Sequence, residues 1–347
     1  MIHDVIVVGS GIAGLSLAQE LRAQGRAPLV LERARGVGGR CATRRVEDQP
    51  VDHGLAFLHG RSAPFLARLA ATLGSAGNIG WPHAGAGTEA AFQPRAFDQG
   101  EWRYAPSDGV NGFAKRLAVG LDVRLETRVE SLQLAADRGD IWELRIDTGE
   151  RLHSRTVALT MPVPSVLALV RQIDPPHAVL GSMISSLESI RILPCLTVIA
   201  RYADGTPVPS WEASYSRASE SRVVQAVLHD SSKRAGSPKL VLVIQGRPEC
   251  SQSHLHDPPE VWTRMLIEEA AAVHGDWART PDFVQSHRWR DAFVDVGTEL
   301  AAPLVSTFDG GAVLGIAGDG LHSSGGAEGA YLSGVALSER LVRRIPA

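Results

Sequence analysis

The sequence is poor in the residues that build disulfide frameworks and zinc sites. Its three cysteines, Cys41, Cys195 and Cys250, are an odd number without a CxxC pair, so neither kind of site is predicted and we expect no metal. No stretch approaches the roughly 20 apolar residues of a membrane span. The first residues, MIHD, also lack the basic region of a signal peptide. We therefore expect a soluble, cytoplasmic protein without a membrane partner.

The sequence also lacks an excess of charge of either sign. Its formal net charge is −3 over 347 residues, with acidic and basic residues interspersed, so no nucleic-acid partner is predicted. Hydrophobic residues make up 44% of the chain, which is enough for a sizeable core. Because a chain of this length exceeds the size at which one core usually keeps growing, we expect two domains.

A glycine-rich turn near the start of the sequence predicts a dinucleotide site. The apolar run 5–8 is typical of a buried parallel strand. It is followed by the turn GSGIAG, by a helical pattern that ends near Gly25, and by a second strand at 28–31 that leads into Glu32. This order of strand, glycine turn, helix, strand and acid is characteristic of dinucleotide-binding units.

Each residue of this motif has a physical task. Gly9 permits the tight turn, Gly11 lets the backbone approach a pyrophosphate, and Gly14 allows the helix to pack closely on the strand. The helix N-terminus offers N–H groups to the phosphates. Glu32 stands 18 residues beyond Gly14, near the spacing at which an acid binds the adenosine ribose. The alternative is a glycine-rich turn without a ligand.

The segment after the second strand indicates which dinucleotide binds. Residues 33–45 read RARGVGGRCATRR, and this GGR-x-x-T pattern resembles the flavin amine oxidase and renalase superfamily. The resemblance implies FAD, with Gly38, Gly39 and Arg40 as contacts to it. We interpret three other arginines of this segment as solvated surface charges. For Arg44 the alternative is that it approaches the flavin. The three residues are Arg35, Arg44 and Arg45.

The C-terminal region contains a second glycine-rich segment, GDGLHSSGGAEGAYLSG, at 318–334. By the same resemblance, a strand at 313–317 ends at Gly318 and Asp319, and Asp319 bonds a ribityl hydroxyl. A last helix from about Ala327 directs its positive end at the flavin, where glycines such as Gly326 leave room for the ring. The resemblance adds Gly318, Gly326 and Ala327 as flavin contacts and places Val129 beside the adenine.

Two further segments resemble renalase-like sequences in particular. Asp52-His53-Gly54 is similar to their DHG motif near the isoalloxazine edge, and 287–292, HRWRDA, is similar to their HRWRYA. Asp291 replaces the usual aromatic residue, and the segment Leu55–His59 also departs from the pattern. Both departures concern the substrate side and leave FAD binding unaffected.

The predicted fold is α/β, a glutathione-reductase-like, Rossmann-type FAD-binding domain with a second, sheet-rich substrate domain. The FAD domain is predicted to comprise residues 1–60, 100–165 and 286–347, and the substrate domain 61–99 and 166–285. Among the individual elements we expect a helix at 109–121 and a polar turn at Asp137–Asp140 between two strands.

The resemblance implies a renalase-like FAD-dependent oxidase of dihydropyridines, such as misreduced NAD(P)H isomers, with O2 as electron acceptor. Amine oxidases of the superfamily usually place a lysine near the flavin, whereas this chain has only Lys115, Lys233 and Lys239. Lys115 is predicted on a surface helix face and Lys233 in a turn, so Lys239, which opens a strand, is the one candidate. At the place where some relatives attach FAD to cysteine, the chain has His322-Ser323-Ser324, so we predict noncovalent FAD. Alternatives are an amine or secondary-metabolite oxidase or dehydrogenase, and a flavin-binding sensor without turnover.

Several residues are candidates for the substrate side. His53, His322 and His287 are the catalytic candidates, and His53 and His322 lead because they flank the two segments that resemble flavin contacts. For each of them a structural hydrogen-bonding role is the alternative. The wider set is His53, His59, His287, Arg288 and His322.

Overall fold

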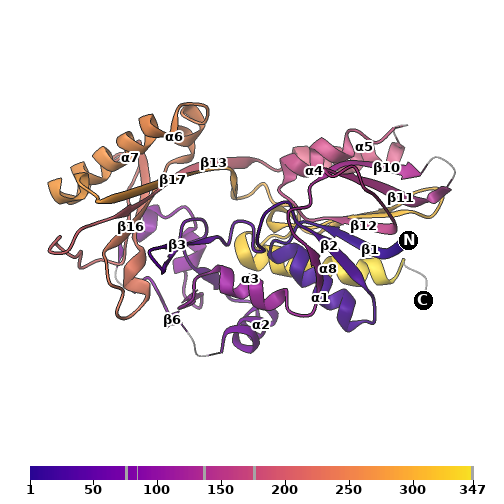
Figure 1. Ribbon diagram of the computed structural model, residues 1–347, viewed down its shortest axis with the longest axis horizontal. Coiled ribbons are helices and arrows are strands. Elements are labelled where there is room, and N and C mark those ends of the chain that lie inside the picture. Colours follow the sequence, from indigo (N-terminus) through magenta and orange to yellow (C-terminus); the bar gives the residue numbers. More distant parts are fainter. Residues whose placement is uncertain (75–76, 84, 136–137, 175–176, 345–347) are drawn as a thin grey trace. The chain divides into compact units, whose positions relative to one another are not determined.

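The computed structural model describes residues 1–74, 77–83, 85–135, 138–174 and 177–344. The chain divides into two compact units, each built from separate segments (Figure 1). Unit 1 comprises Met1–Gly39, Phe113–Ile192 and Val294–Ala347, and unit 2 comprises Arg40–Gly112 and Leu193–Phe293.

These units alternate along the chain in the predicted order but change over at other residues. Segment 40–60 belongs to unit 2, because its side chains pack into that unit's core. Segment 166–192 belongs to unit 1, because its two helices pack on that unit's sheet. The assignment of the two units to cofactor and substrate stays a prediction.

Unit 1 is built around an eight-stranded mixed sheet. Its strands are β1 (Ile2–Val8), β2 (Pro28–Leu31), β9 (Asp122–Arg124), β10 (Val129–Ala135), β11 (Arg138–Ile146), β12 (Arg151–Leu159), β18 (Leu304–Thr307) and β19 (Val313–Ile316). The sheet runs in the order β10-β11-β12-β1-β2-β9, with β19 also paired to β12 and β18 to β19. The strands β9, β2, β1, β12 and β19 are mutually parallel, whereas β10 to β12 form an antiparallel meander.

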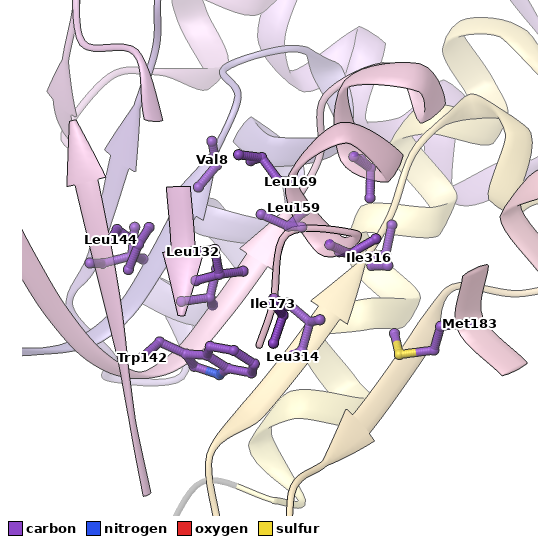
Figure 2. Close-up of a cluster of buried hydrophobic side chains, with 14 of the residues drawn as sticks. Val8, Leu132, Trp142, Leu144, Leu159, Leu169, Ile173, Met183, Leu314 and Ile316 are labelled. Atoms are coloured by element: carbon purple, nitrogen blue, oxygen red, sulfur yellow. The ribbon is translucent and has the colours of Figure 1, made fainter. Parts of the chain in front are cut away.

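Both faces of this sheet are buried, which explains the uninterrupted apolar run in β1. Val5 and Val7 pack with α1 (Ile12–Ala23) and α8 (Gly326–Val342) on one face. Ile6 and Val8 belong to the cluster on the other face, which includes Trp142 and residues of α4 (Val163–Val170) and α5 (Ala178–Glu188) (Figure 2). The alternation of β1 side chains therefore supplies two cores from one strand.

Unit 2 contains a six-stranded sheet in the order β17-β13-β16-β15-β14-β7. These strands are β7 (Gly85–Ala86), β13 (Ile192–Arg201), β14 (Ala213–Tyr215), β15 (Val224–His229), β16 (Val241–Gly246) and β17 (Phe283–Val294). One face packs on α7 (Pro259–His274) through Trp262 and Leu266. The other face packs on the segment that begins at Arg40, through Val51, Phe57 and Trp81.

Smaller elements complete unit 2. A hairpin is formed by β3 (Thr43–Val46) and β4 (Gln49–Asp52), and a three-stranded sheet by β5 (Leu58–Gly60), β8 (Trp102–Ala105) and β6 (Asn78–Ile79). The helices are α2 (Ala63–Leu73), α6 (Pro248–Ser253) and the one-turn elements η1 (Thr88–Ala90), η2 (Pro94–Phe97), η3 (Asp230–Lys233) and η4 (Asp276–Arg279).

Two predicted elements differ from the structure. The helix predicted at 109–121 is α3 (Asn111–Leu117), because Gly109 and Gly120 take positive φ values of 100° and 75° that no α-helix contains. The turn predicted at Asp137–Asp140 is wrong for residues 138–140, which already belong to β11, while Asp137 lies outside the described residues. Within the described ranges, no helix combines the length and the apolar character that crossing a bilayer requires.

Candidate active site

The carboxyl ends of four parallel strands in unit 1 lie side by side. Val8 is in register with Leu31 and with Leu159, and Leu159 is in register with Ile316. The residues that follow these strands are Gly9, Glu32, Thr160 and, after Ala317, Gly318. Such an edge is where open α/β sheets bind their ligands. The structure thus brings together Gly9, Glu32 and Gly318, which were predicted to contact one dinucleotide, and adds Thr160 to the same edge.

The first glycine turn has the shape that a pyrophosphate requires. A Cβ atom on Gly14 would lie 2.1 Å from the Gly9 carbonyl oxygen and 2.5 Å from Thr160 Oγ1, so Gly14 is needed for packing. A Cβ on Gly11 would meet nothing within 4 Å. No described side chain caps the N-terminus of α1, and its first turn carries no acid. The backbone beside Gly11 is therefore open to an anionic group, which fits FAD.

Glu32 is buried at the end of β2 and is held in a fixed orientation. Its Oε2 accepts bonds from the N–H and the hydroxyl of Ser10, at 2.9 and 2.8 Å, and its Oε1 accepts one from the N–H of Ala34 at 2.8 Å. A carboxylate oxygen can accept more than one hydrogen bond, so Glu32 keeps capacity for ribose hydroxyls. Ser10, which the sequence motif leaves variable, orients the acid.

The second glycine turn lies against the first. The N–H of Gly38 donates to the carbonyl of Ser10 at 2.9 Å, and Gly38 and Gly39 have φ values of 112° and 55°. Residues other than glycine rarely adopt such φ values. Val129 begins β10 two residues after Thr127, whose N–H bonds the Glu32 carbonyl at 2.8 Å. Gly38 therefore lies directly against the first turn, and β10 begins close to Glu32. Arg40 begins unit 2, where its guanidinium donates to the carbonyl of Ala292 at 3.4 Å.

The C-terminal segment follows β19 and leads into α8. Gly318 is fixed by Ser333 of α8, whose hydroxyl accepts from the Gly318 N–H at 3.0 Å and donates to its carbonyl at 2.8 Å. Asp319 starts a single turn, η5 (Asp319–Leu321). Gly326 and Ala327 form the first turn of α8, and no described side chain caps its N-terminus. His322 precedes this helix, and its Nδ1 accepts the N–H of Ser324 at 3.2 Å.

Unit 2 brings together the DHG segment at 52–54 and the HRWRDA segment at 287–292. Four side chains, which we call the histidine cluster, are Arg44, His53, His287 and Trp289. The rings of His53 and His287 are 5.1 Å apart, and those of His287 and Trp289 are 4.2 Å apart. Trp289 Nε1 donates to the His53 carbonyl at 3.0 Å, and a Cβ on Gly54 would lie 3.0 Å from the Trp289 ring. DHG and HRWRDA therefore form one packed site.

The imidazoles of this cluster are neutral at physiological pH. Burial lowers the pKa of His53 to about 3, with further contributions from Arg44 and His287. Burial, and then Arg44, lowers the pKa of His287 to about 4. An Arg44 N–H lies 3.1 Å from His287 Nδ1, and because a guanidinium can only donate, His287 carries its proton on Nε2. The cluster therefore has one positive charge, on Arg44.

A second group of buried side chains lies directly before His53. This buried charge cluster consists of Asp52, Asp230, Lys233 and Arg234. Lys233 Nζ is 3.0 Å from Asp52 and 2.5 Å from Asp230, and Arg234 bonds the same two carboxylates at 2.7 and 2.9 Å. Although burial favours protonation of Asp52, Lys233 and Arg234 outweigh it and hold its pKa below the usual value. The two acids and two bases neutralise one another.

The buried charge cluster also fixes the backbone of the DHG motif. Asp230 Oδ1 accepts the N–H of Asp52 at 3.2 Å, and Asp52 Oδ1 accepts the hydroxyl of Thr43 at 2.6 Å and the N–H of Val110 at 2.9 Å. Sequence reasoning identified Lys233 only as a turn residue. Lys233 lies in the one-turn helix η3, which agrees with a turn, but its side chain is fully buried.

The remaining substrate-side candidates lie apart from the histidine cluster or have other partners. His59 contacts Gln93 at 3.0 Å and Glu101 at 3.5 Å. Arg288 donates to the Asp257 carbonyl at 2.7 Å. Asp291, the departure from the family pattern, follows Trp289 by two positions in β17 and therefore lies on the same strand face as His287 and Trp289. His322 belongs to unit 1.

The low pKa of His53 predicts an acid-sensitive fold. Above pH 6.5 the ring is neutral in both the folded and the unfolded chain; as pH falls from 6.5 towards 3, only the unfolded chain binds the proton, so stability is lost. Between pH 7 and pH 5, His53→Gln is expected to lose about 2 kcal/mol less unfolding free energy than the wild type does. Urea titrations at both values measure this. The exposed His256→Gln serves as control, and equal losses in all three proteins would contradict the prediction.

Comparison with known proteins gives two family matches. Residues 7–73 match a family described as an NAD(P)-binding Rossmann-like domain, and residues 88–342, more than half of the chain, match one described as flavin containing amine oxidoreductase. Curated relatives match over shorter segments. (S)-6-hydroxynicotine oxidase of Paenarthrobacter nicotinovorans is 32% identical over 43% of this chain and 34% of its own length. A Mycobacterium tuberculosis protein that carries the name of a flavin-containing monoamine oxidase is 46% identical over 20% of this chain and 15% of its own length. The matches thus span well under two thirds of these relatives.

Solved structures share the fold over almost the whole chain. A putrescine oxidase variant superposes with a TM-score of 0.71 at 15% identity, covering 99% of both chains. Cyclohexylamine oxidase from Brevibacterium oxydans gives 0.69 at 15% identity, covering 99% of this chain and all of its own. These likenesses confirm a Rossmann-like α/β domain with a sheet-rich second domain.

Proposed function

Because the chain belongs to the family of flavin-containing amine oxidoreductases, we propose that it is a renalase-like oxidase of dihydropyridines such as misreduced NAD(P)H isomers. Family membership confirms two coarser predictions, an FAD cofactor and an FAD-dependent oxidoreductase. The observation that carries the finer proposal is the contact between DHG and HRWRDA in the histidine cluster. These two segments are the ones that resemble renalase-like sequences in particular.

The lysines of the chain also favour this function over amine oxidation. Lys233 is enclosed by Asp52 and Asp230, and Lys239 pairs with Asp204 at 2.8 Å. Lys115 lies exposed on α3. Each lysine is thus either ion-paired or exposed to solvent. In the proposed mechanism the protein therefore holds the substrate in place with uncharged imidazoles.

The proposed reaction balances without a covalent protein intermediate. The dihydropyridine ring loses a hydride, which is two electrons and one proton, and becomes an aromatic pyridinium. O2 takes up the two electrons, that proton and a second proton from solvent, and leaves as H2O2. Bound FAD supplies the two-electron chemistry between them. Neutral His53 and His287 hold the substrate ring, and their position near Trp289 provides a planar, partly apolar surface for it.

Anaerobic mixing of the FAD-loaded protein with candidate donors tests the proposal. We expect rapid bleaching of the flavin absorbance by the 2- and 6-dihydro isomers of NAD(P), and none by ordinary NADH or by amines. Admitting O2 should restore the absorbance with one H2O2 per substrate. Bleaching by 6-hydroxynicotine or a simple amine alone would instead support the alternative that the names of the relatives suggest. Bleaching by no donor would leave a flavin-binding protein without turnover.

A further inference from the structure

Arg44 is an arginine with almost none of its bonding capacity used. A guanidinium has five N–H donors, and within the part of the chain that the structure describes the Arg44 side chain has one acceptor, His287 Nδ1, at 3.1 Å. Among the residues that the structure describes, no carboxylate pairs with it. Burial lowers the Arg44 pKa, with no neighbouring negative charge to offset it. The other N–H donors of the Arg44 guanidinium are therefore left for water or for an anion.

Two other arginines of unit 2, Arg234 and Arg247, each have at least three acceptors. Arg234 bonds two carboxylates in the buried charge cluster. Arg247 donates to two backbone carbonyls and to the side-chain oxygen of Gln225. Arg44 differs from both, because its neighbours in the histidine cluster are neutral imidazoles.

The surroundings of Arg44 suit an anionic group attached to a flat ring. Since His287 Nδ1 is occupied by Arg44, its Nε2–H is a second donor beside the same cation. Trp289, 4.2 Å from the His287 ring, adds an aromatic face. Charge-assisted bonds from a guanidinium and an imidazole N–H are a strong combination for phosphate or carboxylate.

We propose that Arg44, together with His287 and Trp289, binds an oxyanion of the substrate, a phosphate or a carboxylate. This inference names the substrate class and, in assigning the anion to a substrate, rests on the proposed function. It distinguishes this chain from oxidases of simple cationic amines, because a second cation beside Arg44 would be repelled.

Calorimetric titration of the oxidised, FAD-loaded protein tests the proposal without turnover. The probes are inorganic pyrophosphate and ADP-ribose for the phosphate source, nicotinate for the carboxylate source, and uncharged nicotinamide for comparison. Arg44→Gln is expected to weaken binding of the preferred anion by about tenfold to a hundredfold and to leave nicotinamide unaffected. Arg44→Lys keeps the charge and should recover part of that loss.

Arg45→Gln is the matched control, because Arg45 is the next residue of β3, exposed, and bonded to the Asp48 carbonyl at 3.2 Å. We expect its anion affinity to stay within about twofold of wild type. The proposal is overturned if no anion binds more tightly than nicotinamide or if Arg44→Gln and Arg45→Gln weaken binding equally. It is also overturned if Arg44→Gln loses FAD, since Arg44 would then serve the cofactor.

Failure of this inference and failure of the proposed function are distinguishable. Anion binding is measured on the resting protein, whereas the dihydropyridine reaction is measured by flavin bleaching. Binding that depends on Arg44 without bleaching by the isomers would keep the anion site and reject the substrate ring. If the isomers bleach the flavin and their KM is unchanged in Arg44→Gln, the proposed substrate ring is kept and the anion site is rejected.

Discussion

Replacement of Lys233 by methionine is expected to lower the free energy of unfolding by about 3–5 kcal/mol, because it leaves two buried carboxylates with one cation. Asp52, Asp230 and Lys233 are fully buried, and Arg234 is 8% exposed. Methionine fills a similar volume, so the cost comes from the unpaired charge and not from a cavity. Lys233 also lies 4.7 Å from the ring centre of Trp81, a contact that methionine keeps only as packing.

Urea unfolding followed by tryptophan fluorescence measures this loss where it occurs, since six of the seven tryptophans, all except Trp142, belong to unit 2. Lys239→Met is the control, because Lys239 pairs with the exposed Asp204 and such pairs contribute less than about 1 kcal/mol. In Lys233→Met one carboxyl group gains a raised pKa. Its protonation relieves the charge, so the deficit should shrink as pH falls from 7 towards 4. If Lys233→Met were as stable as Lys239→Met at pH 7, the buried charge cluster would not have the stabilising role argued for it.

The role of Lys233 illustrates what the sequence could not reveal. The run DSSKRAG is polar and rich in turn-forming residues, which indicates an exposed turn. Lys233 pairs with Asp52, which is 181 residues away in the sequence. A single sequence contains no signal that pairs two such residues. In the sequence, Asp52 stands out only as part of the DHG motif, in which His53 was the candidate residue.

The hairpin that carries Arg44 escaped prediction for a different reason. β3 and β4 are joined by Glu47 and Asp48, whose φ values are 46° and 65°. Two positive φ values are typical of a tight hairpin turn that usually contains asparagine or glycine. Without those residues the segment reads as a polar stretch, and its arginines read as solvated charges.

The C-terminal glycines had more tasks than the sequence suggested. Gly325 and Gly326 take positive φ values of 62° and 55° at the start of α8. A Cβ on Gly334 would lie 2.2 Å from Ser16 Oγ, so this glycine allows α8 to pack closely on α1. Room for a flavin ring remains the prediction for Gly326, but helix packing accounts for part of the same run.

Motifs with strict backbone geometry were the most predictable part. The strand, glycine turn, helix, strand and acid at 5–32 all occur where predicted, because phosphate binding and close packing each require glycine at a set position. This local requirement is independent of the rest of the chain. It also gives the second prediction, since Gly11 and Gly14 have separable tasks.

Gly11→Ala is expected to fold normally and to bind FAD roughly fivefold to a hundredfold more weakly, the effect of about 1–3 kcal/mol of crowding at a close contact. An added Cβ there meets no described protein atom within 4 Å, and φ of −70° suits alanine. The methyl group would therefore collide only with a ligand on the N-terminus of α1. Gly14→Ala should instead destabilise unit 1 itself, because its Cβ would lie 2.1 Å from the Gly9 carbonyl oxygen.

The FAD-to-protein ratio of each variant and the melting temperature of its apoprotein separate these effects. Gly36→Ala is the control, since its Cβ also meets nothing within 4 Å, but Gly36 is not among the predicted contacts. We expect wild-type stability with lost FAD for Gly11→Ala, lost stability for Gly14→Ala and neither for Gly36→Ala. If Gly11→Ala bound FAD as tightly as the wild type, the pyrophosphate could not lie against this turn. FAD would then have to be held elsewhere along the carboxyl edge of the sheet.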